Sequence, residues 1–165
     1  MAVSWGAVCG GGAAAPPPRA GHTFTTLAGG DTHVLFGGSG QGAGGRAASL
    51  ADAHVCRVAP DSGAVAWAPL AVEGPAPPAR ARHTAVALDS KRMLVFGGLV
   101  QPDKTRLNDV WILDVGARRW EAAAPEGGPP PARAHHTGKT RAHGGRGTQR
   151  WEGGKEGRGV AHGSK

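Results

Sequence analysis

Short runs of apolar, β-branched and aromatic residues alternate along the chain with clusters of Gly, Pro, Asp and Ser. Residues 84–88 and 93–96 are two such runs, and the polar segment 89–92 between them predicts a hairpin turn. The other strands predicted in this way lie at residues 23–27, 34–36, 52–56 and 109–113 and around Trp67 and Trp120. No window has a helical period, so the pattern predicts an all-β chain with four antiparallel strands per unit.

The predicted strands belong to a unit that occurs twice and then begins a third time. In each copy a proline-rich segment leads to an arginine and a His-Thr pair, and a Phe-Gly-Gly sequence follows the second strand of both complete copies. His22 and His83 are 61 residues apart, whereas His83 and His136 are 53 residues apart. A period of about 50 to 60 residues indicates a unit that buries its apolar face against a copy of itself.

The order of these motifs resembles the kelch repeat over residues 1–137, most specifically in the second copy, where Trp111 lies in the sequence Asn-Asp-Val-Trp-Ile-Leu-Asp. The resemblance implies a β-propeller in which the double glycine ends the second strand and the late tryptophan packs between blades. The first copy departs from the pattern, because His54 stands in the place of Trp111 and Arg57 in the place of Asp114. The expected fold class is therefore an all-β, partial kelch-type propeller of about two blades.

The repeat pattern divides the chain into five segments. They are an N-terminal strand (1–15) that would complete the last blade of a propeller, kelch repeat 1 (16–76), kelch repeat 2 (77–129), the start of a third repeat (130–137) and a tail (138–165). Trp5 marks the orphan strand, because it precedes Arg19 by nearly the same spacing that separates the later tryptophans from the next arginine. A propeller has about four to eight blades, so we expect an incomplete propeller that needs further blades or self-association for stability.

Residues that recur at equivalent places in the repeats are expected to serve the architecture rather than one active centre. The arginines are expected to hydrogen-bond to carbonyls or carboxylates between blades, and the glycines to provide positive φ or close backbone approach. These structural positions are Arg19, His22, Gly37, Gly38, Trp67, Arg80, His83, Gly97, Gly98, Asp109, Trp111, Trp120, Arg133 and His136.

The tail has a different composition from the repeats. Residues 138–165 hold 9 glycines, 7 Lys or Arg and 2 Glu, and therefore carry +5 of the chain's net charge of +7. Such a composition predicts disorder, because little apolar burial is available to offset chain entropy. The third repeat stops between Thr137 and its expected strand, which favours an altered or truncated C-terminus, such as intron read-through at Gly138-Lys139. The alternative interpretation is a basic Gly-rich arm that binds RNA through phosphate contacts.

No motif in the sequence predicts catalysis, a metal site or a cofactor. Cys9 and Cys56 lack CxxC spacing, and Cys56 is expected to pack in a strand as a small apolar residue. His135 and His136 are adjacent, but His136 occupies the histidine position of the repeat, which favours a structural role. Kelch-like enzymes of the galactose oxidase type use a copper-bound tyrosyl radical, and this sequence has no tyrosine. We therefore expect no enzyme, no metal and no cofactor.

The remaining functional class is protein binding. Residues 39–49 and 99–106 are loops that should lie on one face of the propeller beside the proline-rich segments, and such loops are common recognition sites. These loops carry three cations, Arg46, Lys104 and Arg106, and one anion, Asp103. A fourth cation, Arg82, lies close by. This charge favours a protein partner with an acidic surface, and a solvated basic surface without a partner is the alternative. Nucleic acid is not the expected partner.

The expected localisation is the cytoplasm, with the nucleus as the alternative. Residues 1–18 have no charged n-region and no long apolar core of the kind that a signal peptide needs. No stretch has the length and hydrophobicity of a membrane span, so no membrane partner is expected. Two unpatterned cysteines fit a reducing compartment.

Overall fold

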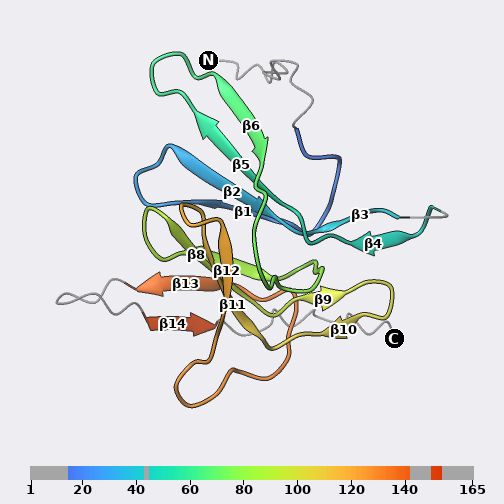
Figure 1. The fold of residues 1–165 in the computed structure, drawn as a ribbon. Coiled ribbons are helices and arrows are strands. Elements are labelled where there is room, and N and C mark those ends of the chain that lie inside the picture. Colours follow the sequence, from blue (N-terminus) through green and yellow to red (C-terminus); the bar gives the residue numbers. More distant parts are fainter. Residues whose placement is uncertain (1–14, 43–44, 142–149, 154–165) are drawn as a thin grey trace, which may run out of the picture.

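Two four-stranded antiparallel sheets form the body of the computed structural model, which describes residues 15–42, 45–141 and 150–153 (Figure 1). Blade 1 has the strand order β1-β2-β5-β6, with β1 (Thr23–Thr26), β2 (Thr32–Phe36), β5 (Ala53–Val58) and β6 (Val65–Pro69). Blade 2 has the equivalent order β7-β8-β11-β12, with β7 (Thr84–Ala87), β8 (Arg92–Phe96), β11 (Val110–Asp114) and β12 (Arg119–Ala123). All eight strands lie where the sequence pattern predicts them, which confirms the partial propeller.

The two blades bury apolar side chains against each other. Because side chains alternate between the faces of a strand, each sheet offers one face to the neighbour. We call the face of blade 1 that meets blade 2 its trailing face, and the face of blade 2 that meets blade 1 its leading face. The cluster between them consists of Leu27, Val34, Phe36, Ala53, Met93, Val95, Leu113 and Trp120. Trp120 is 4% exposed and its ring lies 4.8 Å from that of Phe36, so the late tryptophan packs between blades as expected.

Each second strand ends at two glycines with positive φ. Gly37 and Gly97 have φ angles of 60° and 61°, and Gly38 and Gly98 have φ angles of 100° and 97°. A Cβ at Gly97 would lie 2.7 Å from the carbonyl oxygen of Arg133, and a Cβ at Gly37 would lie 2.7 Å from the carbonyl oxygen of Arg80. The prediction that both positions need glycine is therefore confirmed.

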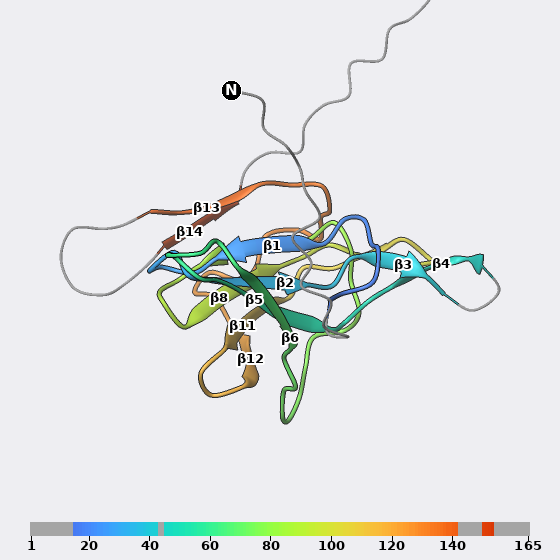
Figure 2. The same ribbon diagram turned by 90° about the horizontal axis from the view of Figure 1, so that it is seen from above.

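The two segments predicted as loops between the second and third strands contain short β-ribbons. Residues 39–49 form β3 (Ser39–Gln41) and β4 (Ala47–Ser49), and residues 99–106 form β9 (Leu99–Val100) and β10 (Thr105–Arg106). Both ribbons extend from the same side of the molecule in two perpendicular views (Figures 1 and 2). Ser49 connects them, because its hydroxyl donates to the carbonyl of Leu99 at 3.5 Å and accepts the amide of Gln101 at 2.8 Å.

The prediction of disorder throughout residues 138–165 is wrong for two short segments. Strands β13 (Gly138–Arg141) and β14 (Arg150–Gly153) pair in an antiparallel hairpin. Strand β13 lies next to β7, as β7 lies next to β1, so it takes the place of a first strand in a third blade. Composition misses this hairpin because main-chain pairing needs few apolar side chains. The rest of the tail lies outside the described residues, as do residues 1–14 with Trp5 and the orphan strand predicted there.

Candidate functional site

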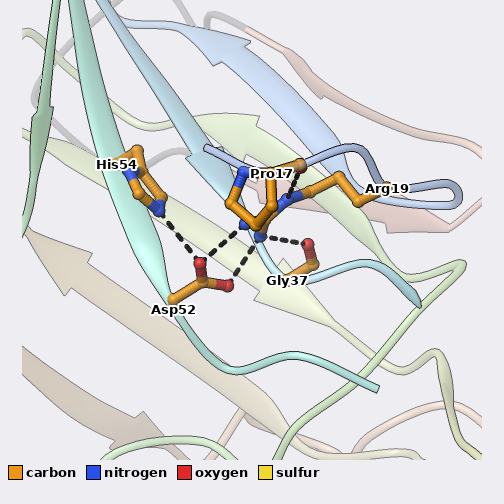
Figure 3. Close-up of polar contacts among 5 residues, drawn as sticks. All are labelled: Pro17, Arg19, Gly37, Asp52 and His54. Carbon is orange, nitrogen blue, oxygen red and sulfur yellow. Dashed lines mark hydrogen bonds and ion pairs between the residues drawn. The ribbon is translucent and has the colours of Figure 1, made fainter. Parts of the chain in front are cut away.

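The arginine of repeat 1 is held by the carboxylate that precedes the third strand (Figure 3). Arg19 donates from Nη1 and Nη2 to Oδ1 and Oδ2 of Asp52 at 2.6 and 2.7 Å, and from Nη1 to the carbonyl of Gly37 at 3.0 Å. His54 donates from Nε2 to Oδ2 of the same aspartate at 2.9 Å. The hydrogen bonds from Arg19 outweigh burial and hold the pKa of Asp52 below its usual value. This bidentate geometry is the strongest form of arginine–carboxylate contact.

Repeat 2 contains the same network in a more buried form. Arg80 is fully buried and donates to both oxygens of Asp109 at 2.7 and 2.6 Å and to the carbonyl of Gly97 at 3.0 Å. Burial acts to raise the pKa of Asp109, but the hydrogen bonds and charge of Arg80 exceed this effect and lower it. Trp111 donates from Nε1 to Asp109 at 2.7 Å, in the place that His54 takes in repeat 1. His54 therefore makes in the first copy the hydrogen bond to the aspartate that Trp111 makes in the second, although it departs from the kelch pattern.

The expectation that these arginine side chains bond between blades is wrong. The guanidinium of Arg80 contacts groups of its own repeat, whereas its main chain joins the previous one. The amide of Arg80 donates to the carbonyl of Leu50, and its carbonyl accepts the amide of Gly38. The side chain stays within its repeat because the aspartate that it needs precedes the third strand of the same sheet. Arg133 repeats the main-chain links with Leu107 and Gly98, and its Nε donates to the carbonyl of Pro131.

The His-Thr pair links consecutive repeats. Nε2 of His83 lies 2.8 Å from the hydroxyl of Thr23, and its ring packs edge-on against Phe36 with centroids 5.2 Å apart. In the next junction the hydroxyl of Thr84 donates to the carbonyl of His136, whose ring packs against Phe96. The structural role predicted for His83 and His136 is therefore a contact with the preceding blade.

Burial of His83 makes stability depend on pH. Burial, followed by the nearby Arg80 charge, lowers its pKa from 6.5 to about 3. Between these pH values the unfolded chain binds a proton that the folded chain does not. The contribution of neutral His83 to the free energy of unfolding is therefore fully present above pH 6.5 and is lost as the pH falls towards 3. From pH 7 to about pH 5 we expect a loss of about 2 kcal/mol, measured by urea denaturation at each pH. His83→Gln should remove this slope, and His22→Gln at the exposed equivalent position should retain it. An unchanged slope in His83→Gln would contradict the assignment.

The cations predicted to bind a partner gather on and beside the two ribbons. Arg46, Lys104 and Arg106 are exposed, the first in the β3–β4 connection and the others in or next to β10. Arg82 lies at the base of the second ribbon, because its neighbour Ala81 pairs with Leu99 of β9. Its guanidinium donates to Nε2 of His135 at 2.5 Å, so this fourth cation is engaged by the third repeat.

The part of the chain that the structure describes contains no group of three or more His, Cys, Asp or Glu that could hold a metal ion. Cys56 is 3% exposed in β5, as predicted, and burial raises the pKa of its thiol. Cys9 lies outside the described residues. No helix among the described residues is long and apolar enough to cross a membrane.

Sequence reasoning missed three residues that organise these contacts. Asp52 could have been found, because it stands two residues before His54 as Asp109 stands two residues before Trp111. Thr23 carried a weaker signal in the repeated His-Thr pair. Ser49 has no counterpart signal in the sequence, since its role depends on the proximity of the two ribbons.

The comparisons with known proteins agree with this architecture. The KLHDC2/KLHL20/DRC7 Kelch-repeats domain model matches residues 4–150. The dynein alpha chain of the flagellar outer arm from Chlamydomonas reinhardtii is 46% identical over 123 residues, which cover 74% of this chain and 3% of that protein. Host cell factor 2 from Homo sapiens is 33% identical over 131 residues, which cover 74% of this chain and 16% of that protein.

Solved structures show the same fold at low sequence identity. YjhT superposes with a TM-score of 0.56 and 18% identity, over 72% of this chain and 41% of that one. A fungal alcohol oxidase of the AA5 family, solved with copper, superposes with a TM-score of 0.53 and 20% identity, over 73% of this chain and 25% of that one. The match of the domain model to most of the sequence shows that the chain belongs to the kelch-repeat family.

Proposed function

We propose that this chain is a non-enzymatic protein-interaction module, part of a larger propeller scaffold, and that its two ribbons bind an acidic protein surface. Membership of the kelch-repeat family supports a protein partner in general. The chain spans 3% and 16% of the two relatives described above, which supports a role as one module of a longer assembly. The absence of tyrosine supports a function without tyrosyl-radical chemistry. We place the module in the cytoplasm or nucleus.

The observation that carries the proposal is the joining of equivalent ribbons from consecutive blades. Ser49 of the first ribbon bonds to Leu99 and Gln101 of the second, so the two ribbons present one surface rather than two separate loops. Three exposed cations lie on this surface against one exposed carboxylate, Asp103. A surface with one dominant sign of charge favours a partner of the opposite sign through faster encounter and better complementarity. No contact of the described residues favours the RNA-binding alternative.

A charge-reversal experiment tests this surface. The variant Arg46→Glu/Lys104→Glu/Arg106→Glu should bind a fluorescein-labelled glutamate-rich peptide about tenfold or more weakly than the wild type, because it replaces attraction by repulsion. Fluorescence anisotropy at physiological salt measures the affinity.

The matched control changes net charge equally at a distance from the ribbons. Arg57, Arg118 and Arg119 are exposed on β5, in the turn before β12 and on β12. The variant Arg57→Glu/Arg118→Glu/Arg119→Glu should retain most of the affinity. Equal loss in both variants would show that only net charge or the basic tail attracts the peptide, and no loss in either would reject the ribbon surface.

A further inference from the structure

Ser49 differs from the other hydroxyl-bearing residues of this chain in its sequence context. It is the only serine or threonine in the sequence with a Lys or Arg at the third position before it, which is Arg46, and the apolar Leu50 follows it. Protein kinases select their substrates partly by charge patterns of this kind, and an arginine at this spacing fits a kinase with an acidic substrate groove. The segment 46–50 is therefore a candidate kinase substrate.

The hydroxyl of Ser49 is also the side-chain group that joins the two ribbons. It donates to the carbonyl of Leu99 at 3.5 Å and accepts the amide of Gln101 at 2.8 Å. Phosphorylation replaces the hydroxyl proton by a group with three acceptor oxygens and a charge of about −1.5 to −2. The carbonyl of Leu99 would then face an anion instead of a donor. The 2.8 Å contact with Gln101 leaves no room for a phosphoryl group, so the ribbons must separate.

The segment around Ser49 can open without unfolding of the blades. Strand β4 pairs only with β3 among the described residues, through three residue pairs. A two-stranded ribbon is marginally stable by itself, and regions with few buried apolar contacts open at low free-energy cost. Both ribbons extend away from the four-stranded sheets, and Arg46 is exposed (Figures 1 and 2). A kinase can therefore bind residues 46–50 as an extended segment.

We propose that Ser49 is phosphorylated by a kinase that recognises Arg46, and that the phosphate abolishes the attraction of the ribbons for an acidic partner. Oγ of Ser49 attacks the γ-phosphorus of ATP, the bond from that phosphorus to the bridging oxygen breaks to release ADP, and the hydroxyl proton passes to a carboxylate of the kinase. The three cations and one carboxylate of the ribbons leave a charge of +2, which a phosphate nearly cancels. The effect on binding rests on the function proposed for the ribbons, whereas the modification does not.

Incubation of the full chain with MgATP and a purified kinase that prefers arginine three residues before serine tests the site. Tandem mass spectrometry should locate the phosphate on Ser49, and Arg46→Gln should slow its incorporation at least tenfold. Ser62 and Ser90 are internal controls, because both are exposed in turns and have alanine at the third position before them. Absence of phosphate from Ser49, or a rate that Arg46→Gln leaves unchanged, would overturn the site.

Two measurements on the purified phosphoprotein test the switch. Amide hydrogen exchange in residues 99–106 should become at least tenfold faster, because the second ribbon loses its contact with Ser49. The affinity for the fluorescein-labelled glutamate-rich peptide should fall about tenfold. Unchanged exchange would overturn the separation of the ribbons.

The charge-reversal variant of the ribbons distinguishes failure of the switch from failure of the proposed function. If that variant loses affinity for the peptide and the phosphoprotein does not, the switch is overturned and the ribbon surface stands. If neither loses affinity, the ribbon surface and its control by phosphate are both rejected. The mass-spectrometric result still decides in that case whether Ser49 is a kinase substrate.

Discussion

Replacement of Arg80 by Ala is expected to lower the free energy of unfolding by about 2–3 kcal/mol, less than the cost of breaking a fully buried ion pair because the side chain of Asp109 is 33% exposed. Arg80 is 0% exposed, and its guanidinium satisfies both oxygens of Asp109 and the carbonyl of Gly97. Its loss leaves Oδ1 of Asp109 and the carbonyl of Gly97 without this donor, whereas Oδ2 of Asp109 keeps the hydrogen bond from Trp111. Urea denaturation followed by circular dichroism measures the change.

The third repeat provides a natural control for this prediction. Arg133 stands at the position equivalent to Arg80, but residues 138–165 contain no Asp that could pair with it. Arg133→Ala should therefore cost less than about 1 kcal/mol. Arg80→Lys keeps the charge but cannot make the bidentate contact, so an intermediate loss is expected. Equal losses in Arg80→Ala and Arg133→Ala would show that the Asp109 network is not the source of the stability.

Replacement of Gly97 by Ala is expected to destabilise the fold by about 3 kcal/mol or more, through two separate effects. The first is the left-handed backbone, with φ at 61°, which a side chain disfavours. The second is steric, because the new Cβ would lie 2.7 Å from the carbonyl oxygen of Arg133 and 3.1 Å from that of Leu107. Both oxygens belong to main-chain hydrogen bonds that join repeat 2 to the start of repeat 3, so relief of the clash would weaken the junction.

Gly63 separates the two effects. Its φ of 66° is almost the same, but a Cβ there would meet nothing within 4 Å. Gly63→Ala should cost about 1 kcal/mol, the backbone contribution alone. Thermal denaturation of both variants measures the loss of stability in each. The extra loss in Gly97→Ala is the cost of the steric clash with the neighbouring carbonyl oxygens. A loss in Gly97→Ala no greater than that in Gly63→Ala would argue against a tight junction.

The candidate site was predicted unevenly from the sequence, for identifiable reasons. Arg80 was recognised as structural because it recurs, but its partner was assigned to the neighbouring blade, since a sequence does not show which carboxylate a long side chain reaches. The four basic residues were grouped correctly around the two ribbons, yet Arg82 is bound to His135 and is less free than the other three. His22 and His83 occupy equivalent positions in the sequence, and only the second is buried, because among the described residues only the second has a blade in front of it.

The sequence by itself determined the two blades, the positions of their eight strands and the need for glycine at the end of each second strand. These properties are local, since side-chain alternation, turn residues and positive φ are encoded within a few neighbouring residues. Only the tertiary structure decided the pairing of Arg80 with Asp109, the lowered pKa of His83, the connection of the ribbons through Ser49 and the hairpin of β13 and β14. Each of these depends on groups brought together from distant parts of the chain, and burial and hydrogen-bond partners exist only after the blades have packed.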